Sequence, residues 1–210
     1  MEEIEVEIVL PEMPDVPRAV EGLAAYMELE PESLGMTSTV DRMVDTEDMV
    51  LLSQDHSLRV RQKVENVFAG NQIRLTYKYP LKEHARLFIR EEQKLTLFEP
   101  EYEPVLQLLS NMSSGVAGQS LITVLQIDEL AREANLGPKG QQLNISVDQC
   151  TYSLPGQGMR TMGEGVFEIE SHGVSEDLVL KAADWVLKNL GGREAAQCKY
   201  ARGLRLLGKL

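Results

Sequence analysis

A charged residue at every second position of several short segments is the feature that most constrains the fold. The chain opens MEEIEVEIVL, in which Ile4, Val6 and Ile8 alternate with acidic residues. Side chains on a β-strand point alternately to its two faces, so such a segment has one apolar face and one ionic face. The same alternation gives charged pairs elsewhere in the chain, namely Arg59 and Arg61, Arg74 and Lys78, Arg90 and Glu92, and Glu168 and Glu170.

These ionic faces have two possible environments. The ordinary one is water, which would leave a plain barrel with solvated charges and an interaction role. Acids that recur at i and i+2 stand about 6–7 Å apart along a strand face, which is close enough to share a divalent cation or its water shell. Paired arginines on neighbouring strands offer forked donors to phosphate oxygens. If both sets face the inside of one closed sheet, the barrel has an ionic lumen that suits a polyphosphate with Mg²⁺ or Mn²⁺.

Turn residues and residue periodicity divide the chain into predicted strands and helices. We predict strands over residues 3–10, 39–45, 49–54, 56–62, 72–80, 85–95, 120–127, 142–153 and 164–171. Helices are predicted over residues 16–29, 102–112 and 175–190, the last with Ser175 as N-cap and glycine after its end. Residues 128–140 are charged and ambiguous, because DELARE fits a helix as well as a strand, and residues 193–207 are expected to end as a helix.

Length and composition limit the classes of protein to consider. At 210 residues the chain is long enough to bury a core, and we expect one domain over residues 1–210. A formal net charge of −12, from 21 basic and 33 acidic residues, argues against a nonspecific nucleic-acid binder or an anionic-membrane binder. We expect no membrane span and no secretory leader. Cys150 and Cys198 show neither metal-ligand spacing nor a disulfide framework, so we expect a cytoplasmic, reducing location.

The charged segments, taken in order, resemble the motifs of a known family. They are EIEVE at the start, VDTED with Asp45 and Thr46, LRVR, LTYK, IREE, VDQ, FEIE and, near residue 200, CKY. In this order they resemble the CYTH superfamily, the triphosphate tunnel metalloenzymes, which include class IV adenylyl cyclases, thiamine triphosphatases and inorganic triphosphatases. The resemblance runs over nearly the whole chain. It implies an α+β fold in which an eight-stranded antiparallel β-barrel forms a tunnel with flanking helices.

The resemblance also implies roles for individual residues. The metal side would consist of Glu3, Glu5, Asp148, Glu168 and Glu170. The phosphate side would consist of Arg59, Arg61, Lys78, Arg90, Arg132 and Lys199, with Arg132 as the nearest candidate for an arginine that the family carries before its aspartate motif. Glu168, Glu170 and Lys78 are the candidates for catalytic roles, and Mg²⁺ or Mn²⁺ is the implied cofactor.

Glu7 departs from the family pattern. The family's first motif ends in a lysine two residues after its second glutamate, and Glu7 stands at that position here. Two unit charges about 4 Å apart interact by about 4 kcal/mol at an effective dielectric of 20, so a carboxylate there would repel a phosphate. We expect Glu7 either to join the metal site or to point away from it.

Three functions remain for a chain of this pattern. The first is a divalent-metal-dependent hydrolase of inorganic triphosphate or a small organic triphosphate, acting by in-line attack of a metal-activated water. The second is a polyphosphate-binding or nucleotide-binding module in which Glu7 has abolished turnover, so that Glu7→Lys would restore it. The third is a class IV-type adenylyl cyclase, which needs an adenine pocket that the sequence does not indicate. The expected partner is a small-molecule triphosphate, and a homodimer is compatible with the sequence.

Overall fold

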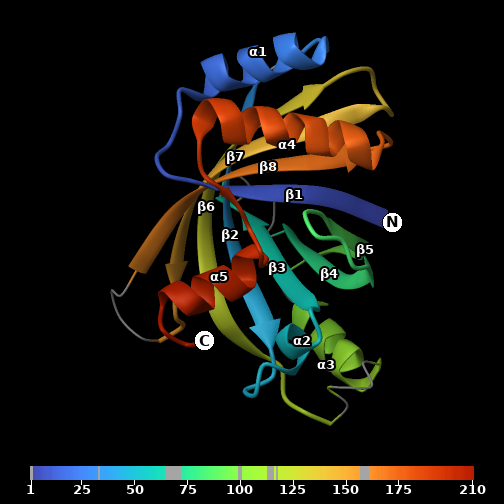
Figure 1. The fold of residues 1–210 in the computed structure, drawn as a ribbon. Coiled ribbons are helices and arrows are strands. Elements are labelled where there is room, and N and C mark those ends of the chain that lie inside the picture. The colour runs from blue at the N-terminus through green and yellow to red at the C-terminus, as the bar shows by residue number, and fades with distance from the viewer. Residues whose placement is uncertain are drawn as a thin grey trace.

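Eight antiparallel strands form a closed barrel (Figure 1). The computed structural model describes residues 2–32, 34–64, 72–98, 101–112, 116, 118–156 and 161–210. The barrel strands are β1 (Glu2–Leu10), β2 (Gly35–Asp45), β3 (Ser57–Lys63), β4 (Gln72–Lys82), β5 (Phe88–Phe98), β6 (Ile122–Leu136), β7 (Gln142–Ser153) and β8 (Thr161–His172). They follow the order β5-β4-β3-β2-β6-β7-β8-β1, and the pairing of β1 with β5 closes the ring. The predicted α+β fold, an eight-stranded antiparallel barrel with flanking helices, is confirmed.

Two helices cover one side of the barrel. These are α1 (Val16–Met27) and α4 (Glu176–Leu190), which lie side by side over β7, β8 and β1 in Figure 1. Their apolar faces meet the outward apolar residues of those strands in one buried cluster that includes Ile8, Leu23, Phe167 and Val186. The Ser175 hydroxyl accepts a hydrogen bond from Leu178 N at 3.4 Å, which makes it the N-cap of α4 as the sequence predicts.

The C-terminal helix closes one end of the barrel. After the short strand β9 (Arg193–Glu194), which pairs with β1, the chain forms α5 (Lys199–Leu206). Tyr200 and Leu204 of this helix are buried against Leu125 and Tyr152 of the barrel wall. The helix packs so closely that a Cβ atom on Gly203 would stand 2.5 Å from the Tyr152 ring. The lumen therefore has an apolar floor at the α5 end.

Two segments differ from their predicted structures. Residues 49–54 are not a strand, because Val50–Ser53 form the short helix α2, and the buried Asp45 carboxylate accepts hydrogen bonds from the backbone N–H groups of Leu51 and Leu52, both at 2.9 Å. Residues 128–136 continue strand β6 rather than forming a helix. A further helix, α3 (Tyr102–Met112), agrees with the prediction for those residues. None of the helices in the described ranges is long and apolar enough to cross a membrane.

Candidate functional site

The ionic faces of the strands point into the barrel. Glu3, Glu5 and Glu7 of β1 are only 4%, 5% and 3% exposed, and they line a cavity of about 260 Å³ inside the ring of strands. In the register of β1 and β8, Glu5 stands opposite Glu170 and Glu7 stands opposite Glu168. The apolar residues between them face the other way and pack under α1 and α4. The lumen rather than the surface is therefore the ionic side of these strands.

Lys78 of β4 and Arg90 of β5 balance the acids of β1. Lys78 Nζ lies 2.5 Å from Glu3 Oε1 and 3.6 Å from Glu5 Oε2. Arg90 donates a hydrogen bond to Glu5, and its Nε lies 3.5 Å from Glu3 Oε2. Burial alone would raise the pKa of Glu5, but Arg90 and Lys78 hold it well below its usual value. Glu5 is therefore ionised, and both cations of this half of the lumen are neutralised.

Arg59 and Arg61 of β3 meet a second pair of acids. Arg61 donates two hydrogen bonds of 2.7 Å to Asp41 of β2, one from Nε and one from Nη2. Its Nη2 also donates to Glu129 of β6 at 2.8 Å. Arg59 Nη1 lies 3.5 Å from Asp41 Oδ2. Burial opposes the charge of Arg61, yet Asp41 and Glu129 raise its pKa well above the usual value. The guanidinium of Arg61 is thus fixed in place before any ligand binds.

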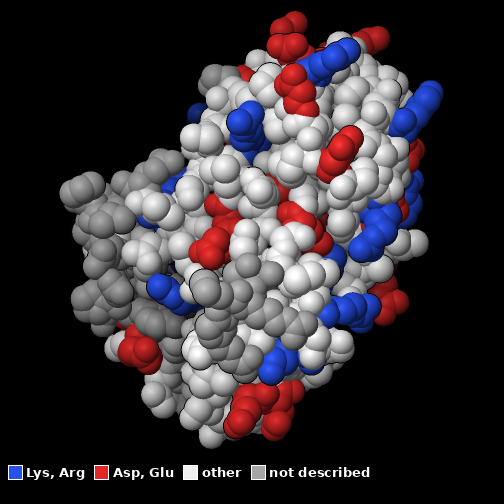
Figure 2. Space-filling view, turned by 90° about the vertical axis from the view of Figure 1, so that its left-hand side faces the viewer, with Lys and Arg blue, Asp and Glu red and all other residues white. Residues whose placement is uncertain are grey.

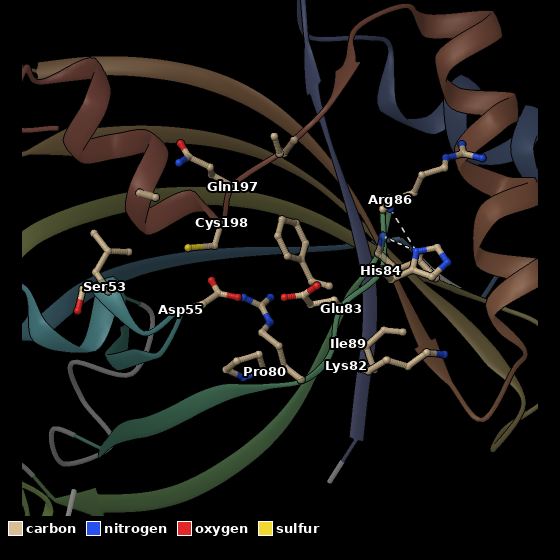
Figure 3. A pocket seen from close by; sticks show the side chains of 18 of the residues that line it. Ser53, Asp55, Pro80, Lys82, Glu83, His84, Arg86, Ile89, Gln197 and Cys198 are labelled. Atoms are coloured by element: carbon tan, nitrogen blue, oxygen red, sulfur yellow. Dashed lines mark hydrogen bonds between the residues drawn. The ribbon is translucent and has the colours of Figure 1, made fainter. Parts of the chain in front are cut away.

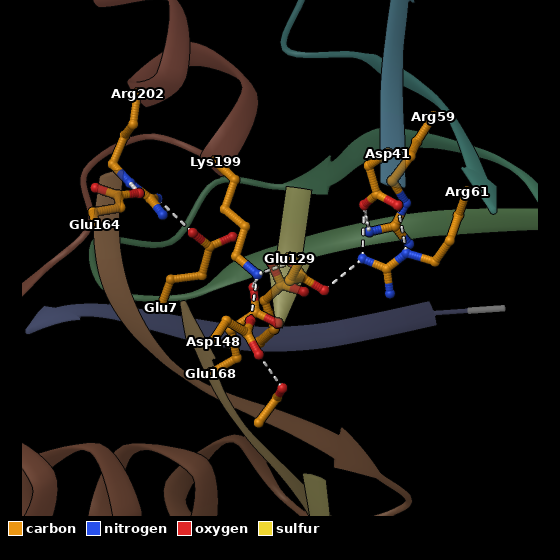
Figure 4. Close-up of polar contacts among 12 residues, drawn as sticks. Glu7, Asp41, Arg59, Arg61, Glu129, Asp148, Glu164, Glu168, Lys199 and Arg202 are labelled. Atoms are coloured by element: carbon orange, nitrogen blue, oxygen red, sulfur yellow. Dashed lines mark hydrogen bonds and ion pairs between the residues drawn. The ribbon is translucent and has the colours of Figure 1, made fainter. Parts of the chain in front are cut away.

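Lys199 enters the lumen from the first turn of α5. Its Nζ lies 2.8 Å from Glu129 Oε2 and 2.8 Å from Glu168 Oε1, and it also donates to Asp148 of β7 (Figure 4). Burial would lower the pKa of Lys199, but Asp148 and Glu129 raise it well above the usual value. Three acids from three strands therefore converge on one ammonium group.

Glu7 is held by the same helix. Arg202 of α5 donates to the Glu7 carboxylate and, through Nε at 2.9 Å, to Glu164 of β8 (Figure 4). Glu164 in turn accepts a hydrogen bond of 2.5 Å from the Tyr152 hydroxyl. Burial raises the pKa of Glu7 to about 8, with Arg202 opposing the rise. Glu7 of β1 thus serves as an anchor for α5.

Glu170 differs from the other lumen acids because few cations approach it. Burial, together with the charges of Glu3 and Glu5, raises the pKa of Glu170 to about 8. His172 Nε2 lies 3.6 Å from Glu170 Oε1, but burial lowers the pKa of this imidazole. Glu170 therefore carries a proton for much of its population at neutral pH, and a cation that binds beside it must displace that proton.

Several buried polar atoms of the lumen lack a hydrogen-bond partner among the described residues. They include Arg59 Nε, Arg90 Nε, Thr76 Oγ1 and Glu3 Oε2, all on residues that line the cavity. Buried donors and acceptors usually find partners, and leaving one without costs about 1–3 kcal/mol. The lumen therefore has hydrogen-bonding capacity for a polar guest, with both donors and acceptors available.

The structure brings together all but one of the predicted site residues. Glu3, Glu5, Glu168, Glu170, Arg59, Arg61, Lys78, Arg90 and Lys199 line the cavity, and Asp148 contacts Lys199 beside it. Arg132 is the exception, because it is exposed on the outer face of β6 while Glu129 and Glu133, at odd positions of the strand, line the lumen. The placement of Arg132 on the phosphate side is therefore corrected.

The site also contains residues that were not predicted from the sequence. Asp41 and Glu129 bind Arg61, while Glu164 and Arg202 complete the network around Glu7. The sequence does contain a signal for Glu129. If residues 128–133, DELARE, form a strand rather than a helix, Glu129 points to the same face as Ile127 and Ala131. Arg202 had no local signal, because its partners lie on β1 and β8.

The acids of the lumen match the chemistry of a divalent cation. Mg²⁺ and Mn²⁺ prefer carboxylate oxygens, and Glu3, Glu5, Glu168 and Glu170 present theirs to one lumen. Glu3 Oε2 is buried without a hydrogen-bond partner in the described chain. Within the same ranges, no three carboxylate, imidazole or thiol groups form a ready metal site, and the three acids that do converge hold the Lys199 ammonium group instead. The residues fit such an ion by donor type, and the cations that now bind them would have to release them.

Comparisons with known proteins identify the fold. No family model and no curated protein matches the sequence. Among solved structures, a "putative adenylate cyclase" from Bacillus halodurans is 18% identical, with a TM-score of 0.59 over 95% of this chain and 96% of the other. A "putative adenylyl cyclase" from Hippeastrum, described as having a dominant triphosphatase activity, is 17% identical, with a TM-score of 0.57 over 99% and 97%.

An archaeal structure agrees with these two. The PH1819 protein from Pyrococcus horikoshii is 17% identical, with a TM-score of 0.56 over 97% of this chain and 98% of the other. All three likenesses extend over nearly the full length of both chains, so the barrel and its flanking helices are shared as a whole. The chain therefore shares its fold with these three solved structures.

Proposed function

We propose that the chain is a divalent-metal-dependent hydrolase that binds inorganic triphosphate or a small organic triphosphate in the barrel lumen. One observation carries the proposal: five cations, Arg59, Arg61, Lys78, Arg90 and Lys199, line one cavity inside the ring of strands together with the acids of β1 and β8. A plain barrel would not bury so many charges, since taking each out of water costs several kcal/mol. The similar structure from Hippeastrum, which is described as having a dominant triphosphatase activity, supports the choice of hydrolysis.

The cations would hold the phosphates by exchanging partners. Lys78 and Arg90 now contact Glu3 and Glu5, and the negatively charged oxygens of a triphosphate are equivalent partners for the same donors. Arg59 lines the cavity, and its Nε has no hydrogen-bond partner among the described residues, so it is a further candidate donor. The walls of the barrel would keep bulk water away and so strengthen each contact.

The acids would hold the metal. Glu3, Glu5, Glu168 and Glu170 are the proposed ligands, with Asp148 close to them through Lys199. A bound Mg²⁺ or Mn²⁺ polarises phosphoryl oxygens and lowers the pKa of a bound water. Glu170, which tends to hold a proton at neutral pH, is the acid whose charge state changes when the ion binds. Glu168, Glu170 and Lys78 are proposed as the catalytic residues, and all three line the cavity.

The proposed partner is a small molecule rather than nucleic acid. Figure 2 shows acidic side chains near the middle of one face with separate basic side chains around them, and the described residues form no continuous basic track across that face. A net charge of −12 agrees with this. We also propose a cytoplasmic location, on the basis of two cysteines that are free in the structure.

Phosphate release with Mg²⁺ or Mn²⁺ tests the proposal. The purified chain should release phosphate from inorganic triphosphate, and Arg59→Ala and Glu168→Ala should each lower kcat/KM by about 100-fold or more. Arg132→Ala is the matched control, because Arg132 lies on the outer face of the barrel, and its kcat/KM should stay within about twofold of the original chain. If no divalent ion supports release above a blank, the hydrolase proposal is rejected.

A binding module is the second candidate. It is favoured by the carboxylate of Glu7 where the family has lysine, since this leaves one phosphate-binding cation fewer on β1. Calorimetry separates the two, because tight triphosphate binding without phosphate release would favour the module. Formation of cyclic AMP from ATP would instead favour the third reading, an adenylyl cyclase.

A further inference from the structure

Cavities adjoin the lumen near both of its ends. Near α5 the lumen shares Arg90 and Cys198 with a cavity of about 1040 Å³. Figure 3 shows the wall of that cavity, built from α2, the turn between β4 and β5, and the segment that leads into α5. Away from α5 the lumen shares Arg61 and Arg74 with a small cavity of about 190 Å³, the rim pocket. The polar lining of the rim pocket is completed by Lys63, Gln72 and Thr96.

The rim pocket lies where β3 ends and β4 begins. Lys63 is the last residue of β3, and Gln72 is the first residue of β4. Met43 of β2, which belongs to the apolar cluster around α5, stands opposite Arg59 of β3. Lys63 lies four residues farther along β3, opposite Thr39. The pocket therefore lies at the end of the lumen that is remote from α5.

The described residues that line the rim pocket carry positive charge only. Arg61, Lys63 and Arg74 are cations, and no aspartate or glutamate is among them. Lys63 and Arg74 are exposed, and neither has a carboxylate partner within the described ranges. The lumen differs, because its other cations are paired with acids. The charge of the rim pocket is therefore unbalanced, and its sign attracts anions.

The strand register places two of these cations directly opposite each other. Arg61 of β3 stands opposite Arg74 of β4, which in turn stands opposite Thr96 of β5. Side chains in such positions start about 5 Å apart on one face of the sheet, and like charges there are destabilising. Lys63 follows Arg61 on the same face, about 6–7 Å along the strand. An anion among these residues would replace their repulsion with attraction.

Both arginines have donors that no described acid uses. Asp41 and Glu129 hold Arg61 through its Nε and Nη2, and neither contact uses its Nη1 (Figure 4). Arg74 has no such contacts within the described part of the chain. Guanidinium groups bind phosphate oxygens through parallel N–H donors, and the Thr96 hydroxyl is a further donor. A phosphoryl group is therefore the anion that these donors fit best.

We propose that the rim pocket is a second anion site, which binds one phosphoryl group beyond the triphosphate site of the lumen. The two sites share only Arg61, because Lys63 and Arg74 do not belong to the proposed phosphate side of the lumen. Pockets for whole small-molecule ligands usually measure about 300–1000 Å³, so about 190 Å³ suits a single oxyanion. Since no described carboxylate lines the pocket, binding there needs no divalent ion.

Two sources can supply the phosphoryl group. Free inorganic phosphate presents the same oxygens as the end of a linear polyphosphate whose first phosphates lie in the lumen. The lumen and the rim pocket meet at Arg61 and Arg74, so a chain longer than triphosphate can extend from one into the other. The first source is independent of the proposed function, whereas the second rests on it.

Calorimetry with inorganic phosphate in EDTA tests the first source. The original chain should bind phosphate without a divalent ion. A chain with Lys63→Gln and Arg74→Gln should bind it at least about tenfold more weakly, because two charged donors are lost. Both residues are exposed, so the fold should survive, and unfolding in urea checks that it does.

The matched control carries Arg132→Gln and Lys139→Gln. These changes remove the same charge from exposed positions elsewhere on the surface, and the dissociation constant for phosphate should stay within about twofold. Equal weakening in the two double variants would show a response to net charge alone, and it would overturn the site.

A linear polyphosphate longer than triphosphate tests the second source. With Mg²⁺ present, the chain with Lys63→Gln and Arg74→Gln should lose at least about tenfold more affinity for the longer polyphosphate than for triphosphate. The control variant should lose no more than about twofold for either ligand. Because the two ligands are compared in one variant, any change in the lumen that affects both of them cancels.

The outcomes separate the two sources and the two proposals. Weaker binding of inorganic phosphate would assign the rim pocket to free phosphate, and a loss confined to the longer polyphosphate would assign it to the end of the chain. If the chain with Lys63→Gln and Arg74→Gln matches the original in both titrations, the site is rejected. An original chain that releases no phosphate from triphosphate would contradict the hydrolase proposal alone, because both titrations measure binding.

Discussion

At the residue scale, Glu7 shows how one unexpected charge is accommodated. From the sequence it was expected to join a metal site or point away, yet it lines the lumen and accepts a hydrogen bond from Arg202 of α5. These two residues are separated by 195 positions, so no local pattern could pair them. The acid on β1 is therefore balanced by a cation from the last helix, Arg202, whose guanidinium also contacts Glu164.

This pairing changes what Glu7→Lys should do. The variant would place an ammonium group against the buried guanidinium of Arg202, and a buried charge that loses its partner costs about 3–5 kcal/mol. We therefore expect the free energy of unfolding in urea to fall by about 3–5 kcal/mol. Adding Arg202→Glu to Glu7→Lys reverses the pair, so at least half of the loss should return.

The control for this experiment is Glu12→Lys, the same substitution at an exposed residue, which should change stability by no more than about 0.5 kcal/mol. A Glu7→Lys chain as stable as the original, with phosphate release that the original lacks, would show that the family lysine site is still available and that Arg202 is not the partner of Glu7.

At the element scale, α5 positions one of the lumen cations. It carries Lys199 into the lumen, and Tyr200 fixes the helix by donating a hydrogen bond of 3.0 Å to the buried Asp45. Gly203 allows the close approach to the barrel wall, because a Cβ atom there would meet the ring of Tyr152 at 2.5 Å and Leu125 at 2.8 Å. The position of Lys199 therefore depends on packing at the other end of the helix.

Gly203→Ala tests that dependence. The added methyl group should force α5 away from the wall, with a loss of about 1–3 kcal/mol in the free energy of unfolding. It should also lower the affinity for inorganic triphosphate by about tenfold, because Lys199 would leave its place. Gly35→Ala is the matched control, since its Cβ would meet nothing closer than 3.8 Å. An unchanged affinity in Gly203→Ala would show that Lys199 does not need a docked α5.

The elements also show how far the sequence determines the site. Strict alternation predicted β1 and β8 correctly, because one face of each packs under helices and the other faces the lumen. DELARE concealed the end of β6, since its residues favour a helix and only pairing with β2 and β7 makes it a strand. This ambiguity accounts both for the wrong side assigned to Arg132 and for the omission of Glu129.

At the scale of the whole molecule, closure of the barrel creates the site. Arg61 and Glu129 are 68 positions apart, and β2 lies between their strands in the sheet, so their contact across the lumen follows from curvature rather than from any motif. Closure also makes the lumen nearly self-neutral, because each described cation facing it, apart from Arg74, has a carboxylate partner. A ligand therefore enters by replacing existing ion pairs.

This exchange predicts that metal and triphosphate stabilise the fold cooperatively. Triphosphate alone must take Lys78 and Arg90 from Glu3 and Glu5, which leaves buried carboxylates unpaired at a high cost, and a metal ion alone leaves the cations unpaired. When both ligands bind, the metal ion pairs with the freed carboxylates and the triphosphate pairs with the freed cations.

In thermal unfolding, the rise in Tm with both Mg²⁺ and triphosphate should exceed the sum of the rises with each one alone, since coupling between two ligands is reciprocal. A Glu3→Gln chain, which keeps the shape but removes one carboxylate charge, should show a smaller excess. Strictly additive shifts would mean that phosphate and metal do not share these residues.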